Sequence, residues 1–233
     1  MKNLQEKLNF LLDKYAVKNG AEISADGKSV TVNGVKYALL PWRNERRLIE
    51  LKKIVDSHTV GQVSHFKIMS LNAKTQNLSE IIKREIDTAE YVSGLKVTEI
   101  FEAKNGETCS VMCMTDKKAV ITLELDATLP ENAETIDKHE IITDRGTACD
   151  RAVDSQTPLS STYVYGEKHE EYTDVDFELY GLSIGEIAAV RQAFDVAKNV
   201  ALGKELNVAN DRLNSILKAA EESEKNCENV ILK

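Results

Sequence analysis

The chain has 233 residues, of which 42% are hydrophobic and 29% are charged, and this length suits one large domain or one medium domain with appendages. Its formal net charge of -8 disfavours a nucleic-acid partner, because the phosphate backbone attracts basic surfaces. No apolar run approaches the roughly 18 residues that span a bilayer, so no membrane association is expected.

The N-terminus and the cysteines together indicate a cytoplasmic protein. The stretch MKNLQEKLNFLLDKY lacks the long apolar core of a signal peptide, and its acidic residues are unlike a transit peptide. The four cysteines are sparse and are interpreted as reduced thiols. Cys109 and Cys113 share a face of an expected strand. They form either half of a metal site or, as the lack of a second His or Cys pair favours, two small residues on a buried face.

Residues 1–42 predict a small segment of helix and strands. Leucines at helical spacing indicate an amphipathic helix over 3–18, and Gly20 supplies its end. Asp-Gly at 26–27 and Asn-Gly at 33–34 then separate three short runs. Because these dipeptides favour the left-handed turns of tight hairpins, we expect a short β-meander here.

Residues 43–204 predict a larger domain in which helices alternate with a series of strands. Apolar stripes at helical spacing, and runs of alternating polarity bounded by glycine or turn residues, define its elements. The first half contains a helix at 44–57, a strand at 63–70, a helix at 77–93 ended by Gly94, and strands at 96–103, 107–114 and 119–126. The spacing of about ten residues between the last three strands is typical of an antiparallel meander.

The remaining elements complete an α+β pattern. Ser183 and Glu186 form a capping box at the start of a strong helix. In chain order, the expected elements are a polar loop at 129–138, strands at 140–143, 161–165 and 172–180, a helix at 184–202 ended by Gly203, and a last helix at 210–225 within the segment 205–233. We expect a large, mostly antiparallel open sheet with helices on one face.

Charged runs and histidines give only weak indications of a site. An acidic run at 169–178 fits a divalent-cation site or, as we favour, the solvated face of a half-buried strand. The four histidines are scattered, so nothing local supports a catalytic set. We interpret the main basic cluster as the solvated face of a helix; it comprises Arg43, Arg46, Arg47, Lys52 and Lys53.

The motifs of several enzyme classes are missing from the sequence. It contains no GxGxxG or GxxxxGK[ST] phosphate loop, no GxSxG nucleophile turn, no HExxH and no CxxC. We therefore expect no cofactor and no metal in this chain.

The stretch REIDTAEYVSGLKVTEIFEA at 84–103 is similar to a helix, glycine and strand in the C-terminal domain of the glucose–fructose oxidoreductase / inositol dehydrogenase / MocA family. The order of the pieces carries the resemblance more than any one of them. Other pieces of the family pattern lie at 43–68, 117–130, 139–150 and 179–204. The resemblance implies an open antiparallel sheet, which in the family binds substrate and often forms the dimer interface.

The sequence also departs from the family pattern. The first 42 residues are too few for the family's dinucleotide-binding domain, and the Glu-Lys-Pro motif has no match. Counted back from Asp87, the positions of the family's helix aspartate and acid/base histidine hold Glu80 and Arg84. Arginine stays protonated and cannot serve as a base. Four residues apart, the two also suit a simple helix-surface ion pair.

Three hypotheses of function follow. We favour a non-catalytic or degenerate oxidoreductase-like domain that binds a small sugar-like ligand or mediates assembly, either as a homo-oligomer through the sheet face or with a Rossmann-domain oxidoreductase partner. The second is a subunit of a split NAD(P)-dependent sugar or polyol oxidoreductase. The third is a cofactor-independent lyase or epimerase. No catalytic residue is assigned, and the candidate ligand-binding residues are Glu80, Arg84, Asp87, His65 and Arg145.

Overall fold

A computed structural model describes residues 4–150, 161–165, 169–173, 178–179 and 181–232. The chain divides into two compact units, one formed by 1–45 with 175–212 and the other by 46–174 with 213–233. These units differ from the three consecutive segments expected from the sequence, because the N-terminal segment packs with a helix from the C-terminal part of the chain. No helix among the described residues is long and apolar enough to cross a bilayer.

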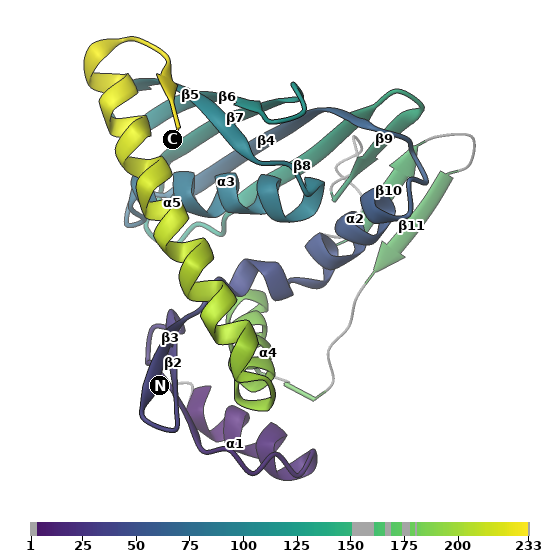
Figure 1. The fold of residues 1–233 in the computed structure, drawn as a ribbon, viewed down its shortest axis with the longest axis vertical. Coiled ribbons are helices and arrows are strands. Elements are labelled where there is room, and N and C mark those ends of the chain that lie inside the picture. Colours follow the sequence, from purple (N-terminus) through teal and green to yellow (C-terminus); the bar gives the residue numbers. More distant parts are fainter. Residues whose placement is uncertain (1–3, 151–160, 166–168, 174–177, 180, 233) are drawn as a thin grey trace. The chain divides into compact units, whose positions relative to one another are not determined.

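The first unit begins with the predicted helix and meander. Helix α1 (Leu4–Lys14) buries its four leucines. Strands β1 (Ala21–Ile23), β2 (Ser29–Val32) and β3 (Val35–Ala38) form an antiparallel sheet in that order (Figure 1). The backbone φ angles of Asn33 and Gly34 are 51° and 78°, which is the left-handed pair that the Asn-Gly turn predicts.

Helices α4 (Ile184–Lys198) and α5 (Val200–Asn226) correct a prediction about Gly203. The predicted capping box at Ser183 is present. The helix is interrupted at Asn199, and the next helix, α5, continues through Gly203. A Cβ atom at Gly203 would lie 2.6 Å from the ring of Tyr37. The glycine therefore permits close packing within the first unit and does not end a helix.

The second unit is built on a large sheet, which among the described residues has nine strands in the order β11-β10-β9-β8-β4-β7-β6-β5-β12 (Figure 1). Only the pairing of β4 with β7 is parallel within this described sheet, so the mostly antiparallel prediction is confirmed. The strands are β4 (Val63–Ala73), β5 (Val97–Asn105), β6 (Thr108–Thr115), β7 (Val120–Leu129), β8 (Ile136–Thr143), β9 (Gly146–Cys149), β10 (Ser161–Tyr165), β11 (His169–Thr173) and β12 (Val230–Ile231).

Two strand predictions were wrong at their boundaries. The polar loop expected at 129–138 is shorter, because β7 continues to Leu129 and β8 already begins at Ile136. The strand expected at 172–180 overlaps β11 only at its start, and Glu178 and Leu179 lie in a turn. Most of the expected acidic face of that strand, at 174–177, lies outside the described residues.

Helices cover one face of the sheet, as predicted. They are α2 (Arg46–Asp56), α3 (Leu78–Ser93) and the part of α5 that belongs to this unit (Figure 1). The Asn77 side chain caps the start of α3 by accepting from two backbone N–H groups, and Gly94 ends the helix with a φ of 69°. The buried isoleucines of α3 then pack toward the strands.

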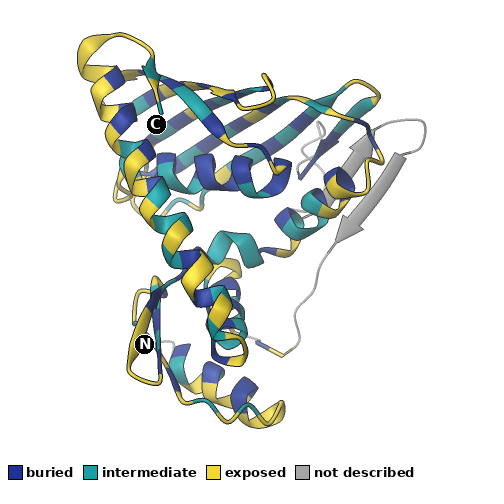
Figure 2. Cartoon of the chain, in the orientation of Figure 1, coloured by how far each residue is buried: buried dark blue, intermediate teal, exposed yellow. Residues whose placement is uncertain are grey.

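Burial alternates along the strands, so the sheet has a covered face and an open face (Figure 2). On β6, Cys109 and Cys113 lie on the covered face, while Met112 is 56% exposed on the other. Burial raises the pKa of each of these two thiols to about 12. Both cysteines therefore remain protonated and act as small apolar residues, which confirms the favoured interpretation.

Candidate functional site

The five candidate residues do not come together. Glu80 is exposed on α3, whereas Asp87 on the same helix is 1% exposed. His65 lies on β4, next to the buried Phe66 and therefore on the open face of the sheet. Arg145 lies in the exposed turn between β8 and β9. Of the five, only Arg84 belongs to the cluster described next.

A buried charge network occupies the covered face of the sheet near α2, α3 and β8. Its basic members neutralise its acidic members when the histidine is protonated. We define it by six side chains: Arg47, Arg84, Glu85, Asp137, His139 and Asp150.

His139 lies at the centre of this network and is fully buried. Its Nδ1 lies 2.5 Å from Oδ2 of Asp150, and its Nε2 lies 2.9 Å from Oε2 of Glu85. The backbone N–H of His139 also donates to Oδ1 of Asp150, at 2.7 Å. One carboxylate therefore fixes both the backbone and the ring of this residue.

Burial by itself would lower the pKa of His139, since it disfavours the charged ring. The charge and hydrogen bond of Asp150, followed by those of Glu85, outweigh it and raise the pKa to about 10. The imidazole therefore stays protonated near neutral pH, with each ring N–H donating to a carboxylate.

Asp137 joins the two arginines. Arg47 donates to it from both terminal guanidinium nitrogens, at 2.6 and 2.7 Å, and Nη2 of Arg84 lies 3.0 Å from its Oδ2. Burial would raise the pKa of this carboxyl, but the charge and hydrogen bonds of Arg47 and the charge of Arg84 hold it well below its usual range. Asp137 therefore remains ionised and binds α2 and α3 to β8.

Glu85 leaves one atom of the network without a hydrogen bond. Its Oε1 is buried and accepts none from the described residues; Nη1 of Arg84 lies 3.5 Å away, as an ion pair. The hydroxyl of Thr88, one turn further along α3, is also buried without a hydrogen-bond partner. Buried polar atoms are rarely left in this condition.

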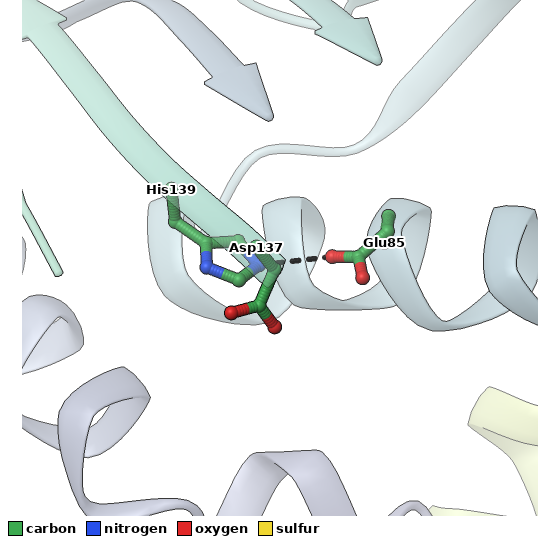
Figure 3. Close-up of side chains that lie close together, drawn as sticks. All are labelled: Glu85, Asp137 and His139. Carbon is green, nitrogen blue, oxygen red and sulfur yellow. Dashed lines mark hydrogen bonds and ion pairs between the residues drawn. The ribbon is translucent and has the colours of Figure 1, made fainter. Parts of the chain in front are cut away.

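Three members of the network have the spacing of a possible metal centre. One ligand atom from each of Glu85, Asp137 and His139 lies within 4.8 Å of the other two (Figure 3). Figure 3 shows Glu85 on its helix facing the imidazole, with the Asp137 carboxylate beside the ring.

The sequence interpretation missed most of this network. Arg47 was assigned to a solvated basic face, but its side chain is only 13% exposed and ion-paired. Asp137 was placed in a loop, and His139 was given no role. Two signals were present: Arg47 and the buried Leu51 are four apart on a helix, and Asp137, His139 and Ile141 alternate as residues on one face of a strand do.

Polar and apolar side chains are mixed on the open face of the sheet. His65 hydrogen-bonds with the hydroxyl of Thr122 at 2.8 Å, and burial, followed by the charge of Lys67, lowers its pKa. A shallow depression of about 500 Å³ lies farther along this face, lined partly by Met69, Ser110 and Glu124. No hydrogen bond within the described residues connects this face to the buried charge network.

Comparisons with known proteins give the fold. No protein-family model matches the sequence, and no curated protein does. Among solved structures, the chain resembles an oxidoreductase from Agrobacterium radiobacter in complex with NAD+, L-tartaric acid and magnesium, at a TM-score of 0.66 and 13% identity over 84% of this chain and 64% of that one. Levoglucosan dehydrogenase in complex with NADH and L-sorbose matches at a TM-score of 0.66 and 14% identity, over 83% of this chain and 65% of that one.

A third similar structure is the myo-inositol 2-dehydrogenase from Lactobacillus plantarum, with a TM-score of 0.59 and 14% identity over 84% of this chain. The chain spans 64% of the length of that enzyme, a little under two thirds. Identities this low establish the fold alone. The solved structures that resemble the chain are oxidoreductases of the glucose–fructose oxidoreductase / inositol dehydrogenase / MocA type, and the fold that the sequence resemblance implied is therefore confirmed.

Proposed function

We propose that the chain is a non-catalytic, oxidoreductase-like domain that acts by assembly, with the open face of its sheet as the contact surface. The observation that carries the proposal is the state of Arg84. It occupies the position where the resemblance implies an acid/base histidine, and it is held by ion pairs to Asp137 and Glu85.

The arginines, Asp137 and His139 of the buried charge network are unsuited to proton transfer near neutral pH. A guanidinium does not give up its proton, and the low pKa of Asp137 keeps that carboxyl ionised. His139 is fully buried and holds its proton between two carboxylates, so a substrate has no access to it. A general acid/base needs a pKa near the working pH and contact with the reacting group.

The open face of the sheet supports assembly. Met112, Met114 and Ile136 are 56%, 38% and 37% exposed there, which is high for large apolar side chains on a sheet. Lys67 and Glu124 place charges of both signs among them. A surface with apolar anchors and mixed charges resembles protein interfaces more closely than a uniformly solvated face.

The partner is a second copy of the chain or an oxidoreductase that carries a Rossmann domain, and in the latter case the chain acts as a subunit of a split dehydrogenase. A sugar-like ligand in the depression near Ser110 and Glu124 is compatible with both, since hydroxyl and carboxylate groups bind sugar hydroxyls. The four cysteines, all of which are free thiols, fit a cytoplasmic location.

Light scattering after size-exclusion chromatography tests self-assembly. We expect the wild type to form oligomers at micromolar concentration and Met112→Arg to shift it toward monomer, because a charge would be buried at the contact. Val208→Arg is the matched control, since Val208 is 70% exposed on α5 and lies outside the sheet. A wild-type monomer at high concentration refutes self-assembly, as does an equal effect of both substitutions.

Affinity capture from the source cells separates the two partners. Capture of a Rossmann-domain oxidoreductase by the wild type, and its loss with Met112→Arg, supports the split dehydrogenase. Titration of NADH into the isolated chain should give no binding in either case. Binding of NADH to the chain alone contradicts the non-catalytic proposal.

A further inference from the structure

We propose that Glu85, Asp137 and His139 form a buried binding site for one divalent first-row transition-metal ion such as Zn²⁺ or Mn²⁺. One nitrogen and two carboxylate ligands suit these ions. The three side chains come from α3 and β8, and their ligand atoms lie within 4.8 Å of one another (Figure 3). The proposal is independent of the assembly function, since the site lies on the opposite face of the sheet.

The first argument is the unused oxygen of Glu85. The residue is 0% exposed, and its Oε1 accepts no hydrogen bond among the described residues. A buried carboxylate oxygen that accepts no hydrogen bond has lost the hydrogen bonds of its hydration shell without replacing them. A cation shared with the imidazole would complete its coordination, which the ion pair with Arg84 at 3.5 Å does not.

The second argument is the set of groups behind the ligands. Asp150 lies 2.5 Å from Nδ1 of His139, and a carboxylate that accepts this N–H fixes the ring so that Nε2 faces a metal. Asp137 is held from the other side by Arg47 and Arg84. Its Oδ1 accepts one bond, from Arg47, so one of the two lone pairs on that oxygen remains for a metal.

Metal binding exchanges one ion for one proton. The ring N–H at Nε2, which now donates to Glu85, dissociates; the proton leaves to solvent and the nitrogen lone pair bonds to the metal. The net charge of the network rises by one, because an ion of charge +2 replaces one proton. Because His139 and Glu85 are fully buried, the bound ion is shielded from substrates and has a structural role.

Isothermal titration calorimetry on chain treated with EDTA and then freed of it tests the site. Zn²⁺ and Mn²⁺ are the probes, and Mg²⁺ at the same ionic strength is the control, because it favours all-oxygen sites. We expect one Zn²⁺ per chain, release of one proton per ion as measured in buffers of different ionisation enthalpy, and a raised melting temperature. Failure of both Zn²⁺ and Mn²⁺ to bind overturns the proposal.

Two variants locate the binding. Glu85→Gln keeps a hydrogen-bond acceptor for His139 but removes a charged ligand, so we expect Zn²⁺ affinity to fall at least about tenfold. His65→Gln removes a histidine from the open face and should leave the affinity unchanged. Equal binding by wild type and Glu85→Gln, or loss of binding in His65→Gln, refutes the assignment. If Glu85→Gln does not fold, Cys227→Ser decides, because the exposed Cys227 thiol would also release a proton on binding Zn²⁺. Unchanged Zn²⁺ binding and proton release in Cys227→Ser support the buried site, and loss of binding refutes it.

Discussion

His139 and His65 lie on neighbouring strands of one sheet and face opposite sides of it. Burial lowers the pKa of both rings, since it disfavours the charged form in each. On the covered face, Asp150 and Glu85 reverse this effect for His139 and raise its pKa to about 10. On the open face, Lys67 adds to the effect of burial on His65, while the charge of Glu140 opposes it only in part.

The difference shows that partners, and not depth of burial, decide the charge of a histidine in this protein. The more deeply buried ring is the charged one, because it has two carboxylates within hydrogen-bonding distance. The half-exposed ring has the hydroxyl of Thr122 instead. The covered face therefore uses charge to connect helices to strands, and the open face leaves its polar groups available to a partner.

The largest expected effect comes from removing the central carboxylate of the covered face. Asp137→Ala leaves Arg47 and Arg84 largely buried without that partner, and breaking a buried pair in this way costs about 3–5 kcal/mol of the free energy of unfolding. Urea denaturation measures it. Glu131→Ala is the control, because its ion pair with Lys74 is mostly exposed and should contribute less than about 1 kcal/mol. Similar losses in both variants would contradict a special role for the network.

The second prediction concerns the pH dependence of stability in metal-free protein. The pKa of His139 is higher in the folded state than the unfolded value of about 6.5, so its contribution to stability is complete below that pH and is lost as the pH rises through about 10. Denaturation curves between pH 6 and 10.5 should show this loss in the wild type. The difference in free energy of unfolding between wild type and His139→Gln separates the contribution of His139 from the titration of lysines and tyrosines. A difference that stays constant with pH would refute the prediction.

The third prediction compares the two rings directly by NMR. The ring protons of His65 should titrate with a midpoint below about 6.5, whereas those of His139 should show no titration between pH 5 and 8. His65→Gln assigns the titrating signal. A common midpoint for the two histidines would mean that the carboxylates do not hold the proton of His139.

The smallest effect is expected on the open face. Thr122→Val removes the hydroxyl that is hydrogen-bonded to His65 at a partly solvated position. The free energy of unfolding should fall by about 1 kcal/mol or less. The same substitution removes a polar partner of the ring, so a change in the His65 midpoint measured by NMR serves as a second readout. A decrease in the free energy of unfolding as large as that of Asp137→Ala would mean that the two faces of the sheet do not differ in their contribution to stability.

Local sequence patterns predicted the elements whose signals are local. The Asn-Gly turn at 33–34, the Asn77 start of α3 and its Gly94 end all depend on residues within one turn, and the structure confirms them. The prediction that Gly203 ends a helix was wrong, because the small size of this residue serves a tertiary contact with Tyr37. Rules for helix ends consider only residues that are close in sequence. The open antiparallel sheet followed from regular strand spacing and from the family resemblance.

The buried charge network could not be predicted in the same way. Arg47 and Asp137 are 90 residues apart, and His139 is 54 residues from Glu85. Charged residues are usually solvated, so each of them alone suggested a surface position. Only the pairing of β8 with β4, together with the packing of α2 and α3 on that side, brings the charges close enough to neutralise one another.

The position of β4 at the middle of the sheet has a consequence for how the chain folds. Strands β5, β6 and β7 follow one another through short turns and can pair as soon as they are made. Among the described strands, β4 pairs with β7 and β8. His65 of β4 lies opposite Val120 of β7, and Ile68 of β4 lies opposite His139 of β8. Long chain segments separate β4 from both of these partners, and closing them costs conformational entropy before the strand contacts form. The second unit should therefore complete its sheet late and slowly, on the order of milliseconds to seconds, as is usual for folds dominated by distant pairings.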